Sequence, residues 1–377
     1  MARILIVTRD DDGVAPALGV GAALRRRGHD VRVLGHPQQY PAVHAAGLGF
    51  AAYTQAPPAP PTGAPTERQL LANQVAQAID PRPGLEVRAE LVRRPPDLVL
   101  VDALSLAALK AAQRSGVPTA ALLRTFHRFG THHWARGAVG VAATLRGLRP
   151  RKLWDAAGRV LVATDPDLDP ATDLPANVRH VGAVLGPVRP PAREPEHLVA
   201  VSLGSQARPG RGEVLQRVLD ALAAAGVPAL VATGDGVDRA SLNPPAGVEL
   251  HRRIDHADLL ARAHLLIGHG GHDTTVRALA NDLPVLVLPP HPPLDHAVVG
   301  EAVARVGAGR MLDAHATPET IREAVAALLA DGPQHAAAAA AGARIRSRDG
   351  AAVAADELEA QLSGVSGGGD GSRTTRG

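Results

Sequence analysis

The chain has 377 residues, 45% of them hydrophobic, which is enough for two domains or one large one. It contains no cysteine, which excludes disulfides and cysteine-ligated metal. The net charge is only +3 and the arginines are scattered, so a nucleic-acid partner is not expected. No apolar run reaches the roughly 18 residues that span a bilayer. We therefore expect a cytoplasmic protein with no membrane partner.

The first half of the chain alternates between short apolar runs and helical patterns. Arg3–Thr8 and Val31–Leu34 are predicted strands, and Ala15–Arg27 between them has helical periodicity, which makes a βαβ unit. The turn after the first strand lacks G-x-G-x-x-G, so a dinucleotide cofactor is not indicated. Two further helices are predicted, at Thr66–Ile79 with Thr66 as N-cap and at Ala103–Ser115. Further strands are predicted at Asp97–Val101, Thr119–Leu123, Arg159–Ala163 and Val178–Val181. This alternation is typical of an α/β doubly wound domain.

A proline-rich segment divides the chain. Gly186–Glu196 contains four prolines and predicts a linker. After it, strands are predicted at Leu198–Ser202, Ala229–Ala232, Val248–Leu250, Leu265–Ile267 and Val285–Leu288. Helices are predicted at Gly212–Ala225, Ala257–Ala263, Pro318–Ala330, Gln334–Arg346 and Ala351–Leu362, and one more helix is predicted to begin at about Asp295. We therefore expect an N-terminal domain at residues 1–187, a linker at 188–196, a C-terminal domain at 197–348, a C-terminal helix at 349–362 and a disordered tail at 363–377.

One stretch, Leu265–Thr275, joins a buried apolar strand to a helix start through a glycine turn. A helix N-terminus has unpaired N–H groups and the positive end of the helix dipole, so it favours an anion. Gly270 and Gly271 let the backbone approach a phosphate, and His269 and Thr274 add side-chain donors. The stretch predicts a diphosphate site, and a plain glycine-capped strand–turn–helix is the alternative.

The same stretch carries a resemblance to a known family. His269–Thr275 followed by Leu283–Pro289 resembles the donor-binding signature of family 1 glycosyltransferases, and it is most similar to that of bacterial enzymes that glycosylate antibiotics and other natural products. Val201–Ser205 resembles the strand and glycine turn that open the family's C-terminal domain, and Pro16–Val31 resembles its first acceptor-domain helix. The likeness covers most of residues 1–330.

That resemblance implies the GT-B fold, which is two facing doubly wound α/β domains with a cleft between them. The N-terminal domain of such an enzyme takes the acceptor, the C-terminal domain takes the nucleotide-sugar, and the C-terminal helix crosses back to the N-terminal domain. No metal and no other cofactor are implied, because the helix dipole and hydrogen bonds stabilise the leaving diphosphate. The implied nucleotide-sugar-binding residues are Gly204, Ser205, Arg253, Ile254, His269, Gly270, Gly271, His272, Asp273, Thr274, Asp295 and His296.

The chain departs from the family at the general base. Members commonly have a histidine in the turn after the first strand, where this chain has Gly13. Asp12, Asp102 and His127 are the remaining candidate catalytic residues, and a solvated turn at Asp10–Asp12 is the alternative for the first of them. A carboxylate with an ordinary pKa of about 4 is a weak base for a hydroxyl unless burial raises that pKa.

A second departure follows the predicted strand that ends near Pro289. Many relatives have an Asp-Gln pair there that binds the sugar hydroxyls, whereas this chain has Pro292 and Pro293. Prolines offer neither side-chain nor backbone donors. Either Asp295 and His296 contact the sugar instead, or the sugar has fewer hydroxyls, as a deoxyhexose does.

Aromatic residues make up only 2% of the chain, and several of them lie together. Phe126, Phe129 and Trp134 are interspersed with His127, His132 and His133. This segment predicts a loop in which the three aromatics bind the acceptor, with ordinary core packing as the alternative. Metal is not expected there, because no second carboxylate or cysteine has suitable spacing. Asp165–Asp169 lacks the glycine and glutamate of a calcium loop and predicts an exposed turn.

The whole chain is therefore interpreted as an inverting, metal-independent glycosyltransferase. It would move a sugar, such as a deoxyhexose, from a TDP- or UDP-sugar to a small natural-product acceptor. A C-glycosyltransferase or another nucleotide-sugar enzyme of the same fold is one alternative, and a non-catalytic homologue that binds a nucleotide-sugar is another. A homodimer is compatible with the sequence, which leaves the acceptor, the sugar, the nucleotide and the base open.

Overall fold

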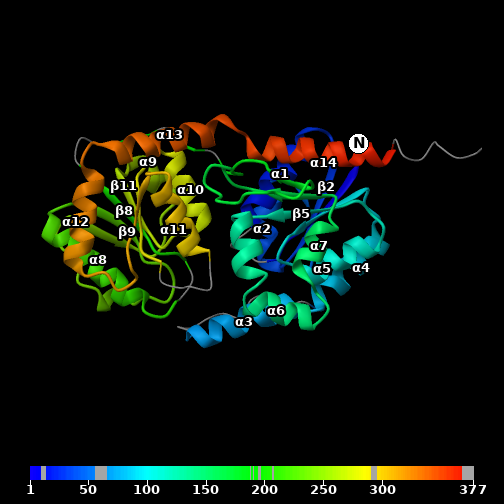
Figure 1. The fold of residues 1–377 in the computed structure, drawn as a ribbon, viewed down its shortest axis with the longest axis horizontal. Coiled ribbons are helices and arrows are strands. Elements are labelled where there is room, and N and C mark those ends of the chain that lie inside the picture. The colour runs from blue at the N-terminus through cyan, green and yellow to red at the C-terminus, as the bar shows by residue number, and fades with distance from the viewer. Residues whose placement is uncertain are drawn as a thin grey trace, which may run out of the picture.

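The computed structural model describes residues 1–9, 14–55, 66–186, 188–189, 191–193, 197–205, 208–289 and 295–366. Two parallel β-sheets, each covered by helices, lie side by side along the long axis of the molecule (Figure 1). We call the part built on the first sheet the N-terminal domain and the part built on the second the C-terminal domain. The predictions made for Asp12, Gly13, Pro292 and Pro293 lie outside the described residues.

The N-terminal domain contains a seven-stranded sheet of order β3-β2-β1-β4-β5-β6-β7, and all its pairs are parallel. Its strands are β1 (Arg3–Val7), β2 (Asp30–Gly35), β3 (Gly49–Ala52), β4 (Leu98–Asp102), β5 (Thr119–Leu123), β6 (Arg159–Val162) and β7 (Val178–His180). Its helices are α1 (Val14–Arg26), α2 (Tyr40–Ala45), α3 (Glu67–Ile79), α4 (Arg82–Arg93), α5 (Leu106–Arg114), a π-helix (Phe129–Trp134), α6 (Ala138–Leu145) and α7 (Pro150–Asp155). Both β4 and β5 are buried along their whole length, as a parallel sheet covered on both faces requires.

The C-terminal domain contains a six-stranded parallel sheet of order β10-β9-β8-β11-β12-β13. Its strands are β8 (Val199–Ser202), β9 (Ala229–Ala232), β10 (Val248–His251), β11 (Leu265–Gly268), β12 (Val285–Val287) and β13 (Gly309–Met311). Its helices are α8 (Arg211–Ala225), α9 (His256–Arg262), α10 (His272–Ala280), α11 (His296–Arg305), α12 (Pro318–Leu329) and α13 (Pro333–Ser347). The strand order reverses between β8 and β11, so the carboxyl ends of these two strands are where a ligand is expected.

The last helix, α14 (Gly350–Ser366), lies against the N-terminal domain beside α1 (Figure 1). Ala354, Ala355 and Leu358 are fully buried in the same apolar cluster as Ile4 and Leu100 of the first sheet. The helix therefore completes the cover of a sheet that begins more than 300 residues earlier in the chain. It also corrects the predicted boundary of the tail, because residues 363–366 are helical.

Most of the predicted elements are present, with slightly shifted ends. Thr66 is the N-cap of α3, and it forms a capping box with Gln69. The elements that the sequence did not predict include β3, β13, α2, α4, the π-helix, α6 and α7. Helix α4 was not predicted because Pro83 and Gly84 are unfavourable inside a helix. Both residues lie in the first turn of α4, where they are compatible with a helix.

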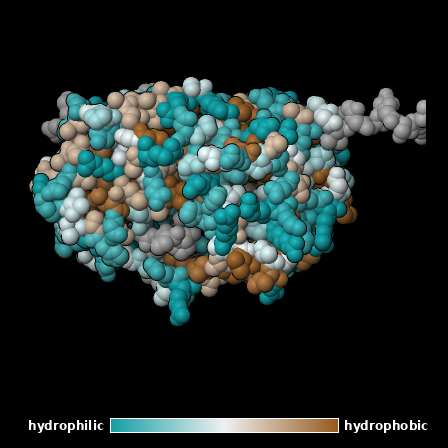
Figure 2. Space-filling model, viewed as in Figure 1, coloured by the Kyte–Doolittle hydropathy of each residue, from teal (hydrophilic) through white to brown (hydrophobic). Residues whose placement is uncertain are grey.

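The face of the molecule in Figure 2 is mostly hydrophilic. Apolar side chains gather at its lower edge, in the region of α6, where Val141 is 51% exposed and Leu145 is 82% exposed. Within the described part of the chain, no helix combines the length and the apolar character that crossing a membrane requires.

Candidate active site

The carboxyl ends of β8 and β11 meet at the centre of the second sheet. The two strands pair in parallel with Ser202 opposite Gly268, so the turns that follow them leave the sheet at the same edge. One turn contains Gly204 and Ser205, and the other is His269–Gly271. The structure thus brings together the two glycine turns that were predicted to bind the nucleotide-sugar, at the edge where open α/β sheets bind ligands.

Helix α10 begins directly after the second turn, with Gly271 as its N-cap. Glycine has no side chain to cap the helix, and the first helical hydrogen bond runs from Thr275 N to Gly271 O at 3.0 Å. The N–H groups of the first turn, which include that of the half-buried Thr274, are therefore left for an anion. The Asp273 carboxylate lies in the same turn and pairs with Arg277 at 2.8 Å.

Gly270 occupies a position that only glycine fits. Its φ is +84°, and a methyl group on its Cα would lie 2.5 Å from the carbonyl oxygen of His296 and 2.9 Å from Val287 Cγ1. The turn thus packs directly against the start of α11.

The His269 ring lies beside the N-cap of α10, since a methyl group on Gly271 would be 2.7 Å from it. Its Nδ1 is 3.4 Å from the carbonyl oxygen of Ser202, and its ring packs edge-on against His296 with 4.5 Å between ring centroids. Burial lowers the pKa of His269 to about 4, so the ring is neutral at pH 7. A neutral imidazole has one N–H to donate.

Two further residues that were predicted to bind the nucleotide-sugar, Arg253 and Ile254, follow β10 at the same edge of the sheet. Arg253 is exposed and pairs with Asp235 at 2.7 Å, while Ile254 packs partly buried against the apolar core. The backbone N–H of Asp235 donates to the carbonyl oxygen of Ser205 at 2.8 Å. The turn after β8 is therefore tied to the loop that holds Arg253.

Two of the predicted donor-site residues contact the N-terminal domain. The Nε2 atom of His272 is 2.8 Å from Thr164 Oγ1, and its ring meets Phe126 edge-on at 5.3 Å between centroids. Burial lowers the pKa of His272 as well. Asp295 accepts a hydrogen bond from Thr125 Oγ1. The α10 and α11 N-termini thus lie at the junction between the two domains.

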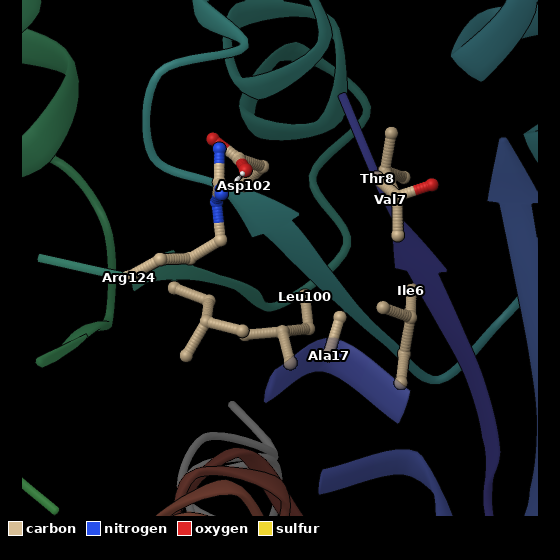
Figure 3. A pocket seen from close by; sticks show the side chains of 8 residues that line it. Ile6, Val7, Thr8, Ala17, Leu100, Asp102 and Arg124 are labelled. Atoms are coloured by element: carbon tan, nitrogen blue, oxygen red, sulfur yellow. Dashed lines mark hydrogen bonds and ion pairs between the residues drawn. The ribbon is translucent and has the colours of Figure 1, made fainter. Parts of the chain in front are cut away.

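On the N-terminal side of this junction, Asp102 is the last residue of β4 and is 7% exposed. Its Oδ2 accepts a hydrogen bond from Arg124 Nε at 2.7 Å, and the two side chains lie together in Figure 3. Its Oδ1 accepts a hydrogen bond from Leu104 N at 2.9 Å. The cavity beside this pair measures about 10 Å³, which is room for a single water molecule. Arg124 was not singled out from the sequence, although its place just after β5 puts it at the ligand-binding edge.

His127 is held by a buried carboxylate. Its backbone N–H donates to Asp169 Oδ2 at 2.6 Å, and the same oxygen is 2.9 Å from His180 Nε2. Burial lowers the pKa of the His127 ring, and the charge of Asp169 opposes that shift. The prediction that Asp165–Asp169 is an exposed turn is right for the turn and for Pro166 and Asp167, but wrong for Asp165 and Asp169, which are only 5% and 4% exposed.

The predicted acceptor aromatics are buried. Phe126 is 1%, Phe129 is 5% and Trp134 is 7% exposed, and all three belong to the apolar core, as the alternative interpretation holds. Trp134 also lines a cavity of about 290 Å³ between α3, the π-helix and α6. Its other lining residues are Leu71, Gln74, His132, His133, Arg136, Gly137, Ala138 and Val139. Over the described residues, no group of three or more histidines and carboxylates is arranged to hold a metal ion.

Comparison with known sequences agrees with this architecture. A family model described as "Erythromycin biosynthesis protein CIII-like, C-terminal domain" matches residues 216–360. A PGL/p-HBAD biosynthesis glycosyltransferase of Mycobacterium tuberculosis is 33% identical over 187 residues, which is 48% of this chain and 42% of that protein. This match thus spans a little under half of the length of the mycobacterial relative. An L-demethylnoviosyl transferase of Streptomyces niveus is 27% identical over 89% of this chain and 91% of its own length.

Solved structures resemble the whole chain. CalG4, the calicheamicin glycosyltransferase, superposes with a TM-score of 0.75 at 28% identity, covering 96% of this chain and 98% of that one. The glycosyltransferase VinC, solved in complex with dTDP, has the same fold, with a TM-score of 0.74 at 20% identity over 96% of this chain and 99% of that one. With two parallel sheets and glycine turns at the switch between β8 and β11, the chain has the fold of the GT-B glycosyltransferases, and the proteins that it resembles are glycosyltransferases, several of them of the antibiotic and natural-product type.

Proposed function

We propose that this protein transfers a sugar from a nucleoside diphosphate sugar to a small natural-product acceptor. The observation that carries the proposal is the N-terminus of α10, which offers its first N–H groups beside His269 at the carboxyl edge of the second sheet. A diphosphate matches such a site in charge and in its need for several donors. The contact between His272 and Thr164 places the same helix end against the N-terminal domain, where an acceptor would approach the sugar.

The donor is proposed to be a TDP-sugar, with a UDP-sugar as the alternative. VinC, which has the same fold, was solved with dTDP, and this favours the thymidine nucleotide. The two prolines at positions 292 and 293 favour a sugar with few hydroxyls, such as a deoxyhexose, because prolines offer no donors to bind them.

The acceptor is proposed to enter beside the cavity at Trp134. Its volume of about 290 Å³ is at the lower limit for a small-molecule pocket, and it has both apolar lining from Leu71 and Val139 and basic lining from Arg136. The apolar side chains exposed on α6 lie in the same region. These features suit a largely apolar acceptor that carries an acidic or phenolic group.

The reaction is proposed to be a single displacement that inverts the anomeric carbon. The acceptor oxygen forms a bond to that carbon while the bond to the diphosphate breaks, and the electron pair leaves with the diphosphate. The acceptor proton goes to a base, for which Asp12, Asp102 and His127 remain the candidates. No metal is invoked, because the α10 N-terminus supplies positive potential to the leaving group.

A second candidate function is nucleotide-sugar binding without transfer. The observation that favours it is the pairing of Asp102 with Arg124, because both carboxylate oxygens already accept hydrogen bonds. A carboxylate engaged in this way is a poor acceptor for the proton of a substrate hydroxyl.

Two measurements separate these proposals. The first is calorimetry with TDP and UDP, and the second is an assay for TDP release from TDP-sugars over a panel of acceptors. We expect the wild type to bind TDP and His269→Ala to bind it at least tenfold more weakly, while His315→Ala, at an exposed histidine, serves as the control. Unchanged TDP binding by His269→Ala would contradict the donor site. TDP binding without release on any acceptor would favour the non-catalytic function. Asp12→Asn, Asp102→Asn and His127→Gln, compared for turnover, then identify the base.

A further inference from the structure

Arg211 is a buried cation whose hydrogen bonds are incomplete. It is the first residue of α8 and is only 4% exposed. Among the described residues, neither its Nε nor its Nη1 has a hydrogen-bond partner. Arginine is almost never fully buried unless it is paired, because a buried charge without a counter-charge is costly. Within the described part of the chain, these two buried N–H donors are therefore left unpaired.

The guanidinium of Arg211 lies in a space made by two glycine turns. A methyl group on Gly204 would lie 3.3 Å from Arg211 Nη2, and a methyl group on Gly234 would lie 3.0 Å from Nη1. Both glycines have positive φ, +93° and +72°, so neither position readily takes another residue. The same methyl group on Gly204 would be 3.2 Å from His269 Nε2. Arg211 and His269 thus both lie close to the same point beside Gly204.

The surroundings of Arg211 are short of negative charge. Burial, and then the charge of Arg208, lower the pKa of Arg211 to about 10, and Asp235 opposes this shift. Asp235 is already paired with Arg252 at 2.8 Å and with Arg253 at 2.7 Å. Arg211 in turn contributes to lowering the pKa of His269. The guanidinium is charged at neutral pH, and an anion above Gly204 would relieve these repulsions.

We propose that Arg211 binds the diphosphate of the donor, as the fixed cation opposite the N-terminus of α10. This inference rests on the proposed function and adds to it a residue and a role. The guanidinium donates its free N–H groups to phosphate oxygens, which matches the planar fork of arginine to a tetrahedral anion. When the bond between sugar and diphosphate breaks, the leaving diphosphate gains one negative charge. Arg211 then stabilises that charge more strongly than it stabilises the bound donor.

Calorimetric titration of Arg211→Gln with TDP, TMP and thymidine tests the proposal. We expect TDP to bind roughly ten- to a hundredfold more weakly than to the wild type, as the loss of a charge-assisted hydrogen bond predicts. TMP should lose less affinity, and thymidine none. The matched control is Arg217→Gln on the same helix, because Arg217 donates instead to the carbonyl oxygen of Ala314 at 2.6 Å and should be neutral for TDP.

Thermal unfolding of the unliganded protein separates binding from a structural role. Because Arg211 is buried without a full set of partners, Arg211→Met should unfold at the same or a higher temperature than the wild type. If the role of Arg211 were structural, its substitution would instead lower the Tm and would weaken the binding of thymidine and of TDP alike. If Arg211→Gln does not fold, Arg211→Lys provides the test instead. Lysine keeps the charge but lacks the planar fork of arginine, so this variant should bind TDP severalfold more weakly and bind thymidine as the wild type does.

TDP binding by these variants within twofold of the wild type would overturn the inference and leave the proposed function standing. A wild type that binds neither TDP nor UDP would instead overturn the proposed function, because the donor site itself would then be absent. A loss of TDP affinity in Arg217→Gln equal to that in Arg211→Gln would also overturn the inference, since it would reflect only the net charge of the domain.

Discussion

His269 is a neutral ring within a cationic neighbourhood, and this determines how the site responds to acid. Its pKa of about 4 in the folded protein is below the ordinary value near 6.5, chiefly because of burial. The unfolded chain therefore takes up the proton first as the pH falls. Since the unfolded state then binds more protons than the folded state, this residue makes stability fall as the pH decreases from about 6.5 to about 4.

We predict that His269→Gln removes this part of the pH dependence. Between pH 7 and pH 5.5 the wild type should lose about 1 kcal/mol more of its unfolding free energy than the variant, as the shift in pKa implies. Urea unfolding at both pH values, with His315→Gln as an exposed control, measures the difference. Equal pH slopes for the wild type and His269→Gln would contradict the burial of the ring.

Gly270 and Gly28 offer a matched pair for testing the turn. Both have positive φ, +84° and +87°, but a methyl group on Gly28 meets nothing within 4 Å, whereas one on Gly270 meets His296 O at 2.5 Å. Gly28→Ala should cost about 1 kcal/mol from backbone strain alone. Gly270→Ala should cost roughly 3 kcal/mol or more, because the α11 start must also move. Denaturant unfolding gives both values, and similar costs would contradict the packing described for Gly270.

Single residues also mark the limit of what the sequence could predict about the site. The glycine turns were predictable, because glycine after an apolar run indicates a tight approach. The burial of Asp165 and Asp169 was not, because their neighbours are prolines and acids, which are typical of exposed turns. Arg124 and Arg211 were not singled out either, because the chain is rich in arginine and only the fold shows which guanidinium is paired and which is not.

Among the elements, the buried strands were the easiest to predict. The runs at β4, β5 and β11 are apolar throughout because helices cover both faces of the sheet. Strand β3, Gly-Phe-Ala-Ala, and strand β13, Gly-Arg-Met, contain no β-branched residue and depend on their neighbours in the sheet for their form. Tertiary pairing, which the local sequence does not encode, therefore determines these two strands.

Helix α14 is attached by apolar contacts more than by its ion pairs. Leu358 is fully buried against the first sheet, whereas Arg27, which pairs with Asp356 and Glu359, lies at the exposed side of the helix. We predict that Leu358→Ala lowers the unfolding free energy by about 3 kcal/mol. Arg27→Gln should have a much smaller effect, because exposed ion pairs contribute little.

Leu145→Ala, at a leucine that is 82% exposed on α6, controls for the loss of a leucine side chain as such. Chemical denaturation followed by circular dichroism measures all three variants. A larger loss from Arg27→Gln than from Leu358→Ala would mean that charge, and not apolar burial, holds the C-terminal helix to the N-terminal domain.

At the scale of the whole molecule, the two domains meet through polar contacts around a buried carboxylate. Arg344 on α13 pairs with Asp165 at 3.3 Å and with Asp167 at 2.9 Å, in the loop after β6. Arg305 on α11 donates to the carbonyl oxygen of Asp167 at 2.8 Å. The side chain of Asp165 is 6% exposed and that of Asp167 is 60% exposed, so the two ion pairs differ in how much solvent screens them.

A pair of double-mutant cycles separates these contributions. The cycle of Arg344→Gln with Asp165→Asn should give a coupling energy of about 1–2 kcal/mol, because removing the arginine leaves a buried carboxylate with one partner fewer. The cycle of Arg344→Gln with Asp167→Asn should give less than about 0.5 kcal/mol, because the second carboxylate is exposed. Urea unfolding supplies the energies, and hydrogen exchange in the loop after β6 should quicken in Arg344→Gln while exchange in β11 stays unchanged. Equal coupling in the two cycles would mean that Asp165 is no more buried than Asp167 in solution, and that the domains close less tightly than the structure has them.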